Sequence, residues 1–434
     1  MSTASANVAT RFVSRASGSA GPVTAKERII SLDVLRGVAL LGILPMNIQA
    51  FSMISAAYMN PTAYGNFHGA NYWVWYFCHL LADEKFITIF SMLFGAGIFL
   101  MTSHVEAAGR KPAPLHYRRM GWLIVFGLMH SYLLWFGDIL VCYGLCGMLA
   151  YCYRKMSPRR LIIYGVGFIA VASILFAWMA WSLPHMPAAK QELFRQVIWE
   201  PTPAMKAHEL AAYRSGWIGE MGQRANDSLT GEISGFIYLA FWRVEGCMLI
   251  GMALFKLGVF SAQRAAKLYW TFIAAAILIG FPVIIYGVHH DIAAGWEFRQ
   301  SFFIGTQYNY WASMLVSLGW VGATMLAYQS SSLRRFTKPI AAVGRMAFSN
   351  YIFDTVVCTT IFYGFGFGLF GTVGRVTQIE IALAIWIAQL ILSSIWMRYF
   401  QFGPLEWLWR SLTYWKRQPF RKVPQASEAV VAAV

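Results

Sequence analysis

The chain has 434 residues, of which 58% are hydrophobic and 12% are charged. Soluble proteins carry about 25% charged residues, so a soluble fold could not cover this much apolar surface. The formal net charge of +16 would suit a nucleic-acid partner, but the basic residues occupy short loops between apolar runs and form no recognition module. The composition therefore indicates a polytopic helical membrane protein and excludes a nucleic-acid-binding protein.

A transmembrane helix needs about 20 apolar residues, and ten runs come close to this length. They lie at residues 34–54, 73–103, 119–136, 138–153, 161–183, 231–257, 268–288, 301–328, 339–363 and 379–399. Residues 1–27 have no apolar core, so we expect a disordered tail there and no secretory signal; a transit peptide has a similar composition. The predicted fold class is all-α, an integral membrane bundle of about ten transmembrane helices.

Basic residues gather on alternate connections between the apolar runs. Cytoplasmic loops carry an excess of Lys and Arg, so both termini are predicted to be cytoplasmic. Residues 184–230 form a long polar outer connection, which either caps or gates the outer face or is a surface excursion with one or two helices. This periplasmic loop separates a first membrane half, 28–183, from a second half, 231–400, which a basic cytoplasmic tail, 401–434, follows.

Four ionisable residues lie near the middle of apolar runs: Lys85, His130, Arg243 and Glu245. A lone charge at the bilayer centre costs from about 2.5 to more than 10 kcal/mol, so such groups persist where they face one another or a hydrated cavity. A helix rises about 1.5 Å per residue, which places all four at similar depth. We therefore predict a shared polar layer, the alternative being separate contacts between helices with no chemistry.

The expected partners within this layer follow from helix geometry. Arg243 and Glu245 are two residues apart and point to nearly opposite sides of their helix. Each therefore needs a partner on another span. Lys85 is the predicted partner of Glu245, and Asp83 or Glu84 is the predicted partner of Arg243.

His130 is the main candidate for catalysis, because an imidazole titrates near about 6.5 and can give or take a proton at working pH. Asp138 follows eight residues later, after Gly137. If this outer turn folds back, the carboxylate orients the ring, as in the base half of an acyl-transfer site. A buried histidine that only joins two helices is the alternative. His68, beside aromatic residues in the outer loop, is a second candidate, although such a position is typical of an interfacial residue.

Five further polar residues form a candidate binding set. Asp33 and Arg36 share a face at a helix start, where they either cap and anchor the helix or bind cytosolic phosphate. Arg345 lies at the inner edge of its run and is expected to meet lipid headgroups or an anionic substrate, while Asn350 lies deeper. Asn47 lies about 20 Å into the first run. The six cysteines show no metal-binding spacing, so no metal is expected.

Several strings resemble the YeiB-like membrane proteins of the DUF418 family, from residue 28 to near the end of the chain. These strings are Arg28–Ile-Ile-Ser-Leu-Asp-Val-Leu-Arg-Gly37, Lys85–Gly97, Gly137–Leu140, Gly344–Tyr351 and Gly403–Arg410. The resemblance implies a multi-pass protein of the bacterial inner membrane. His130 and Asp138 belong to this YeiB-like pattern.

The first half is also similar to transmembrane acyltransferases of the heparan glucosaminide acetyltransferase type, through Asp33–Gly37 and Gly95–Leu100. Those enzymes move an acyl group from cytosolic coenzyme A to a sugar across the membrane. The similarity implies a catalytic histidine after the first span, where His68 lies.

The leading hypothesis is a transmembrane acyltransferase that uses acyl-CoA as donor. The donor would dock at the basic inner face near Arg36, and His130 would act as base or carry the acyl group, with Asp138 orienting it. Lys85 and Asn47 would line the path and polarise the thioester carbonyl. The acceptor would be an envelope glycan or a lipid.

Two other functions are compatible with the same residues. A transporter for a small anionic or lipid-like solute would use Arg243, Glu245 and Lys85 as its binding site. A non-enzymatic membrane scaffold would use every buried charge for structure alone. Membrane lipids are expected partners in each case, and a homo-oligomer is a further option.

Overall fold

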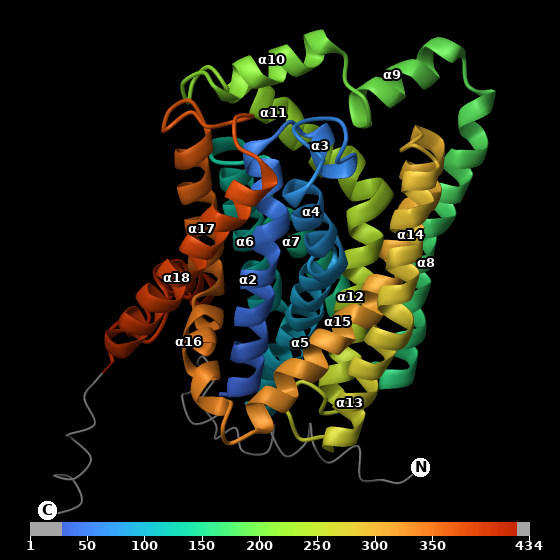
Figure 1. The fold of residues 1–434 in the computed structure, drawn as a ribbon. Coiled ribbons are helices and arrows are strands. Elements are labelled where there is room, and N and C mark those ends of the chain that lie inside the picture. The colour runs from blue at the N-terminus through green and yellow to red at the C-terminus, as the bar shows by residue number, and fades with distance from the viewer. Residues whose placement is uncertain (1–27, 423–434) are drawn as a thin grey trace, which may run out of the picture.

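The protein is described here by a computed structural model of residues 28–422, which form a helical bundle (Figure 1). The predicted N-terminal tail, 1–27, lies outside the described residues. The helices that build the bundle are α2 (Ile30–Ser52), α4 (Ala70–Leu81), α5 (Lys85–Ala107), α6 (Ala113–Leu133), α7 (Leu140–Tyr153), α8 (Pro158–Ser182), α12 (Phe241–Lys256), α13 (Ala266–Ala275), α14 (Phe281–Ala293), α15 (Thr306–Gln329), α16 (Arg334–Arg345), α17 (Ala347–Phe362) and α18 (Arg375–Tyr399).

Seven helical runs among the described residues are long and apolar enough to cross a membrane. They are Ile30–Ser52, Ala70–Ala107, Pro158–His185, Met221–Lys256, Ala266–Ala293, Arg299–Gln329 and Arg375–Tyr399. Of the other predicted spans, α7 is apolar but short, and α6 opens with a polar turn that holds Arg118 and Arg119. The predicted span 339–363 is divided at Met346 between α16 and α17. The membrane class is therefore confirmed, whereas the count of ten stays a prediction.

Small residues allow the central helices to approach closely. A Cβ atom on Gly251 of α12 would lie 1.9 Å from the carbonyl oxygen of Met92 on α5. A Cβ atom on Gly344 of α16 would lie 1.9 Å from the carbonyl oxygen of Asp33 on α2. Glycine is required at both positions because backbones meet there, as is common between membrane helices. The second contact also brings Asp33 next to Arg345, at one end of the bundle.

Irregular segments interrupt several long helices of the bundle, including the π-helices η4 (Ala276–Gly280) and η5 (Arg299–Gly305). Two others adjoin the central helices α5 and α12. The predicted span 73–103 is a broken helix, because α4 ends at Leu81 and α5 begins at Lys85. Between them Glu84 adopts a φ of 63°, which is uncommon for a residue with a side chain. The second irregularity is the π-helix η3 (Gly231–Ala240), which runs into α12. Segments of this kind occur often at functional sites.

A layer of short helices covers one end of the bundle (Figure 1). It consists of α9 (Ala188–Ile198), α10 (Pro203–Tyr213) and α11 (Met221–Thr230), with the small helix α3 (Ala56–Met59) beneath. Glu209 of α10 accepts hydrogen bonds from the backbone and the hydroxyl of Ser55, both at 2.7 Å. The long predicted loop is therefore a helical cap that is tied to the membrane helices. At the opposite end, α19 (Pro404–Tyr414) packs against α6 and α17 within the predicted C-terminal tail.

Candidate functional site

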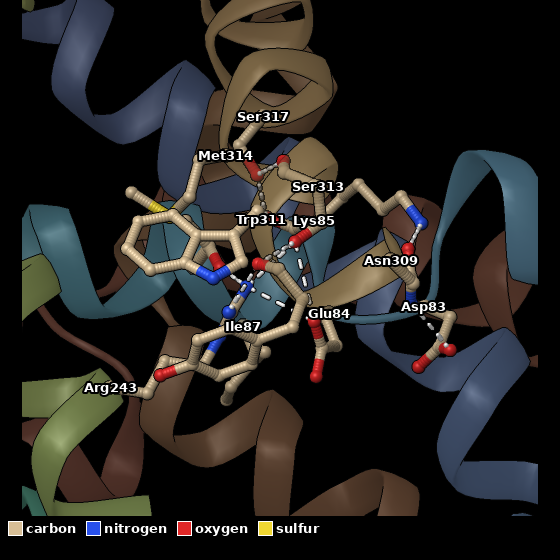
Figure 2. Close-up of polar contacts among 12 residues, drawn as sticks. Asp83, Glu84, Lys85, Ile87, Arg243, Asn309, Trp311, Ser313, Met314 and Ser317 are labelled. Atoms are coloured by element: carbon tan, nitrogen blue, oxygen red, sulfur yellow. Dashed lines mark hydrogen bonds and ion pairs between the residues drawn. The ribbon is translucent and has the colours of Figure 1, made fainter. Parts of the chain in front are cut away.

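The break between α4 and α5 gathers charged side chains inside the bundle (Figure 2). Lys85 is fully buried, and its Nζ donates hydrogen bonds to Asn309 Oδ1 at 2.5 Å and to the carbonyl of His79 at 2.6 Å. Asn309, on α15, donates to Asp83 Oδ2 at 2.9 Å. The amide thus links the ammonium to the carboxylate, and every charge in this chain of contacts has a partner.

Arg243 enters the same region from α12 (Figure 2). Its guanidinium lies 3.3 Å from Glu84 Oε2, so of the two predicted partners, Asp83 and Glu84, it pairs with Glu84. The same group donates to the hydroxyls of Thr88 and Ser313 at 2.9 and 2.7 Å, and to the carbonyl of Tyr310 at 2.8 Å. Arg243 therefore connects the broken helix to α15.

Glu245 does not join this network. Its side chain is fully buried, and neither carboxyl oxygen has a hydrogen-bond partner within residues 28–422. The predicted pairing with Lys85 is wrong, because Lys85 is taken up by Asn309 and the His79 carbonyl. The prediction of one shared layer holds for Lys85 and Arg243 but not for Glu245, which lies two residues beyond Arg243 and faces the other side of α12. It does not hold for His130 either, because the imidazole contacts Asp138 and Thr355 in a separate cluster.

His130 and Asp138 meet as the sequence predicts. The imidazole Nδ1 lies 2.8 Å from Asp138 Oδ1, and each side chain is only 1% exposed. Asp138 Oδ2 accepts the amide hydrogen of Val141 at 2.8 Å. The other imidazole nitrogen, Nε2, lies 2.9 Å from the hydroxyl of Thr355 on α17. Both ring nitrogens are therefore occupied, and the contacts join α6, α7 and α17.

A cavity of about 660 Å³ runs inside the bundle between α2, α5, α6 and α7. Its middle is lined by apolar side chains, among them Leu40, Ile43, Phe90 and Leu93. Asn47 also lines it and makes no side-chain hydrogen bond among the described residues. The backbone turn that holds Asp138 forms part of the wall, while the imidazole of His130 lies behind this wall. The cavity thus offers apolar walls with one free amide.

Arginines surround one end of the cavity, which we call the arginine end. Its members are Arg28, Arg36, Arg119, Arg345 and Arg410. Two carboxylates lie there. Asp33 pairs with Arg28 at 2.5 Å and with Arg36 at 3.2 Å, and Glu406 accepts the backbone N–H groups of Phe348 and Ser349 at the start of α17. The cluster thus holds more positive charge than its own acids neutralise.

Three of these arginines have no carboxylate partner within the described part of the chain. Arg345 donates to the carbonyl of Gln401 at 3.1 Å, Arg119 lies over the Trp409 ring at 4.6 Å, and Arg410 lies over the Phe402 ring. Burial lowers the pKa of Arg410, and the charge of the neighbouring Arg28 lowers it further. The arginine end is therefore suited to an anion with several charges.

Sequence reasoning missed part of this site. The sequence assigns Arg119 and Glu232 no role in a site, although both line the cavity. Arg410 and Glu406, which also line it, lie in the YeiB-like string Gly403–Arg410, but that string assigns them no role. Their positions relative to the cavity depend on helix packing. A search for charged residues within a turn of an apolar run would have found Arg119.

The remaining candidates fall outside the cavity. His68 is exposed in the loop between α3 and α4. Asn350 is buried and donates to the Ser393 hydroxyl at 2.9 Å, which joins α17 to α18. Asp33, Arg36 and Arg345, in contrast, lie at the arginine end, and their binding roles stay predictions.

The fold and the cavity define a polytopic helical membrane protein with an internal cavity that is cationic at one end. Residues 254–416 match the family model described as "Protein of unknown function (DUF418)". The chain is 31% identical to YeiB of Escherichia coli K12 over 391 residues, which cover 89% of this chain and 96% of YeiB. It is 30% identical to YxaH of Bacillus subtilis 168, with 92% and 98% coverage. The chain therefore belongs to the DUF418 family of YeiB-like proteins.

A third relative extends the comparison. The chain is 26% identical, over 402 residues, to a 39.9 kDa protein encoded in the amylase 3′ region of Bacillus acidopullulyticus. The match covers 92% of this chain and 97% of that protein.

Proposed function

We propose that this protein is a transmembrane acyltransferase of the bacterial inner membrane. In this proposal α6, α7 and the α16–α17 pair cross the membrane with the seven longer runs, and both termini are cytoplasmic. The arginine end then faces the cytoplasm, in agreement with the excess of basic residues on that side. Acyl-coenzyme A enters there, and a glycan or lipid acceptor meets the acyl group at the other end.

The observation that carries the proposal is the cavity with its charged end. A coenzyme A thioester has a polyanionic head and a long, mostly neutral arm. Arginine binds phosphate through several parallel hydrogen bonds, and Arg119, Arg345 and Arg410 have no carboxylate partner among the described residues. The apolar section of the cavity accepts the arm and the acyl chain.

Asn47 is the group that we assign to the thioester carbonyl. It lies eleven residues beyond Arg36 on α2, which corresponds to about 16 Å along the helix axis, a distance that an extended pantetheine arm can span. Its amide lines the cavity and is free to donate a hydrogen bond. Such a donor stabilises the negative charge that forms on the carbonyl oxygen during acyl transfer.

His130 and Asp138 receive a positioning role in this proposal. The His130 imidazole lies behind the cavity wall, between Thr355 and Asp138, and Asp138 itself lines the cavity. The pair holds the turn between α6 and α7, of which Gly137 and Ile139 line the cavity. The base role predicted for His130 stays a prediction, because it requires this turn to open.

The direct test is acyl-CoA turnover by the purified protein in nanodiscs. We expect release of free coenzyme A, measured with a thiol reagent, and transfer of radiolabelled acyl groups to an envelope extract. Asn47→Leu is expected to lower kcat about 100-fold or more while the affinity for acyl-CoA is kept. If wild-type protein neither binds nor consumes acetyl-, butyryl- or palmitoyl-CoA, the proposal is wrong.

A transporter is a second candidate, and the broken helix favours it. Interrupted membrane helices with charged residues at the break form the substrate sites of many transporters. Here Glu84 and Ala82 of the break line the cavity, and Glu84 pairs with Arg243. Flux of a radiolabelled anionic solute into proteoliposomes, lost in Glu84→Gln and without release of coenzyme A, would support transport over transfer.

A further inference from the structure

We propose that Glu232 is the general base that accepts the proton of the incoming hydroxyl or amine. The inference rests on the acyl transfer proposed above and assigns a catalytic residue that the sequence did not indicate. Four carboxylate residues line the cavity, namely Glu84, Asp138, Glu232 and Glu406. A base needs a carboxylate oxygen that is free to receive a proton, so the contacts of the four decide between them.

Three of the four are already committed. Asp138 accepts hydrogen bonds from His130 and from the Val141 amide. Glu406 accepts two backbone N–H groups and the hydroxyl of Ser349 at 2.5 Å. Glu84 lies against the Arg243 guanidinium and accepts from Ser313 at 3.3 Å.

Glu232 differs from Asp138 and Glu406 in having one oxygen without a hydrogen-bond partner, and from Glu84 in having no cation beside it among the described residues. Its Oε2 accepts a hydrogen bond from the Tyr132 hydroxyl at 3.2 Å. Its Oε1 has no hydrogen-bond partner among the described residues, and no salt bridge joins it to a cation within residues 28–422. Glu232 is therefore a half-buried carboxylate on the cavity wall with no cation partner in the described part of the chain; its Oε2 accepts one hydrogen bond, and its Oε1 is buried and accepts none.

The backbone places Glu232 where an acceptor would enter. It is the second residue of η3, the π-helix that follows α11 at the capped end of the bundle (Figure 1). Gly231, Phe236 and Ala240 of the same segment also line the cavity. Because these residues and Glu232 all line the cavity, one face of the segment borders it, at the end away from the arginines.

With Glu232 as the base, acyl transfer from the thioester to the acceptor proceeds in one sequence of bond changes. The acceptor's O–H or N–H bond breaks, and its proton moves to the Glu232 carboxylate. The acceptor's oxygen or nitrogen forms a bond to the acyl carbon, while the carbon–sulfur bond breaks and the electron pair leaves with the coenzyme A thiolate. The proton on Glu232 then passes through solvent to the thiolate, which restores the carboxylate and requires no oxidant or metal.

The test compares Glu232→Gln with two matched variants in acyl-CoA turnover with an envelope acceptor. Removing a general base costs about 10²- to 10⁴-fold in rate, so we expect kcat to fall by at least about 100-fold. The dissociation constant for acyl-CoA should stay within about twofold, because the arginine end is unchanged. Glu380→Gln, an exposed glutamate on α18, should leave all rates unchanged. Tyr132→Phe should keep most of kcat but shift the pH profile.

The outcomes separate this inference from the proposed function. A wild type that is active, with a folded Glu232→Gln variant that keeps kcat within about threefold and the wild-type pH profile, overturns the assignment and leaves acyl transfer standing. A wild type that never consumes acyl-CoA overturns both. If Glu232→Gln does not fold, Glu232→Asp decides: a folded variant with reduced kcat and unchanged acyl-CoA affinity supports the base role, and one with wild-type kcat and pH profile contradicts it.

Discussion

The two clusters of buried charge in this protein are built on opposite principles. At the break between α4 and α5 each charged group has a partner within the protein, since Arg243 has Glu84 and Lys85 has Asn309 and a carbonyl. At the arginine end, Arg119, Arg345 and Arg410 have no carboxylate partner in the described part of the chain. A closed network stabilises the fold, whereas an excess of one sign creates a site for a ligand of the other sign.

The largest expected effect is the loss of stability when Arg243 is replaced. Arg243→Gln leaves Glu84, Thr88 and Ser313 without their shared donor, and breaking a buried charge pair typically costs about 3–5 kcal/mol. The loss should appear as a lower melting temperature of the detergent-solubilised protein, followed by size-exclusion chromatography. A variant that melts like wild type would show that the network at the break is not closed.

Replacing Arg345 or Arg410 with a neutral residue should weaken acyl-CoA binding and leave the stability of the protein unchanged. Each variant, Arg345→Gln or Arg410→Gln, should keep the melting temperature, because no carboxylate partner is lost. Hydrogen bonds to charged groups contribute about 1.5–3 kcal/mol, so acyl-CoA should bind about 10- to 100-fold more weakly in titration calorimetry. The effect should shrink as salt rises. A clear loss of stability with unchanged binding would assign these arginines to the fold.

Glu245 lies on α12, as Arg243 does, but outside the charge network at the break, so the stability effects of replacing the two residues can be compared. A buried polar group without a hydrogen-bond partner costs about 1–3 kcal/mol, so Glu245→Leu should stabilise the protein by about that amount. Arg243→Gln, two residues earlier, should destabilise it. Opposite signs in a thermal-shift measurement would support the closed network, while a destabilised Glu245→Leu would mean that Glu245 has a partner in the membrane-embedded protein.

The smallest effect is expected at the hydroxyl of Thr355. Thr355→Val removes its hydrogen bond to His130 while the shape is kept, and one neutral hydrogen bond contributes about 0.5–1.5 kcal/mol. The melting temperature should fall slightly. Thr355→Ser should restore it, since serine keeps the hydroxyl. If Thr355→Val instead keeps normal stability but loses most of its turnover, His130 takes part in the acyl-transfer reaction itself.

Local sequence signals predicted the class of the protein and two specific contacts. The hydropathy of long runs depends on neighbouring residues alone, so the membrane class and most helices could be read directly. The pairing of His130 with Asp138 was also predictable, because a glycine-containing turn of a few residues joins them. The pairing of Arg243 with Asp83 or Glu84 followed from the cost of an unpaired charge at depth.

Only the tertiary structure decided the rest. The break at residues 82–84 falls at the three consecutive charges Asp83, Glu84 and Lys85 of an otherwise apolar run. Arg243 and Asn309, from other helices, satisfy these charges. The isolation of Glu245, the meeting of Arg119 with Arg345 and Arg410, and the contacts of Glu232 depend on which helix faces lie together. The hydropathy of the sequence predicts how deep a residue lies in the membrane. It does not predict which residue it contacts, because contacts between helices far apart in the chain depend on how the helices pack.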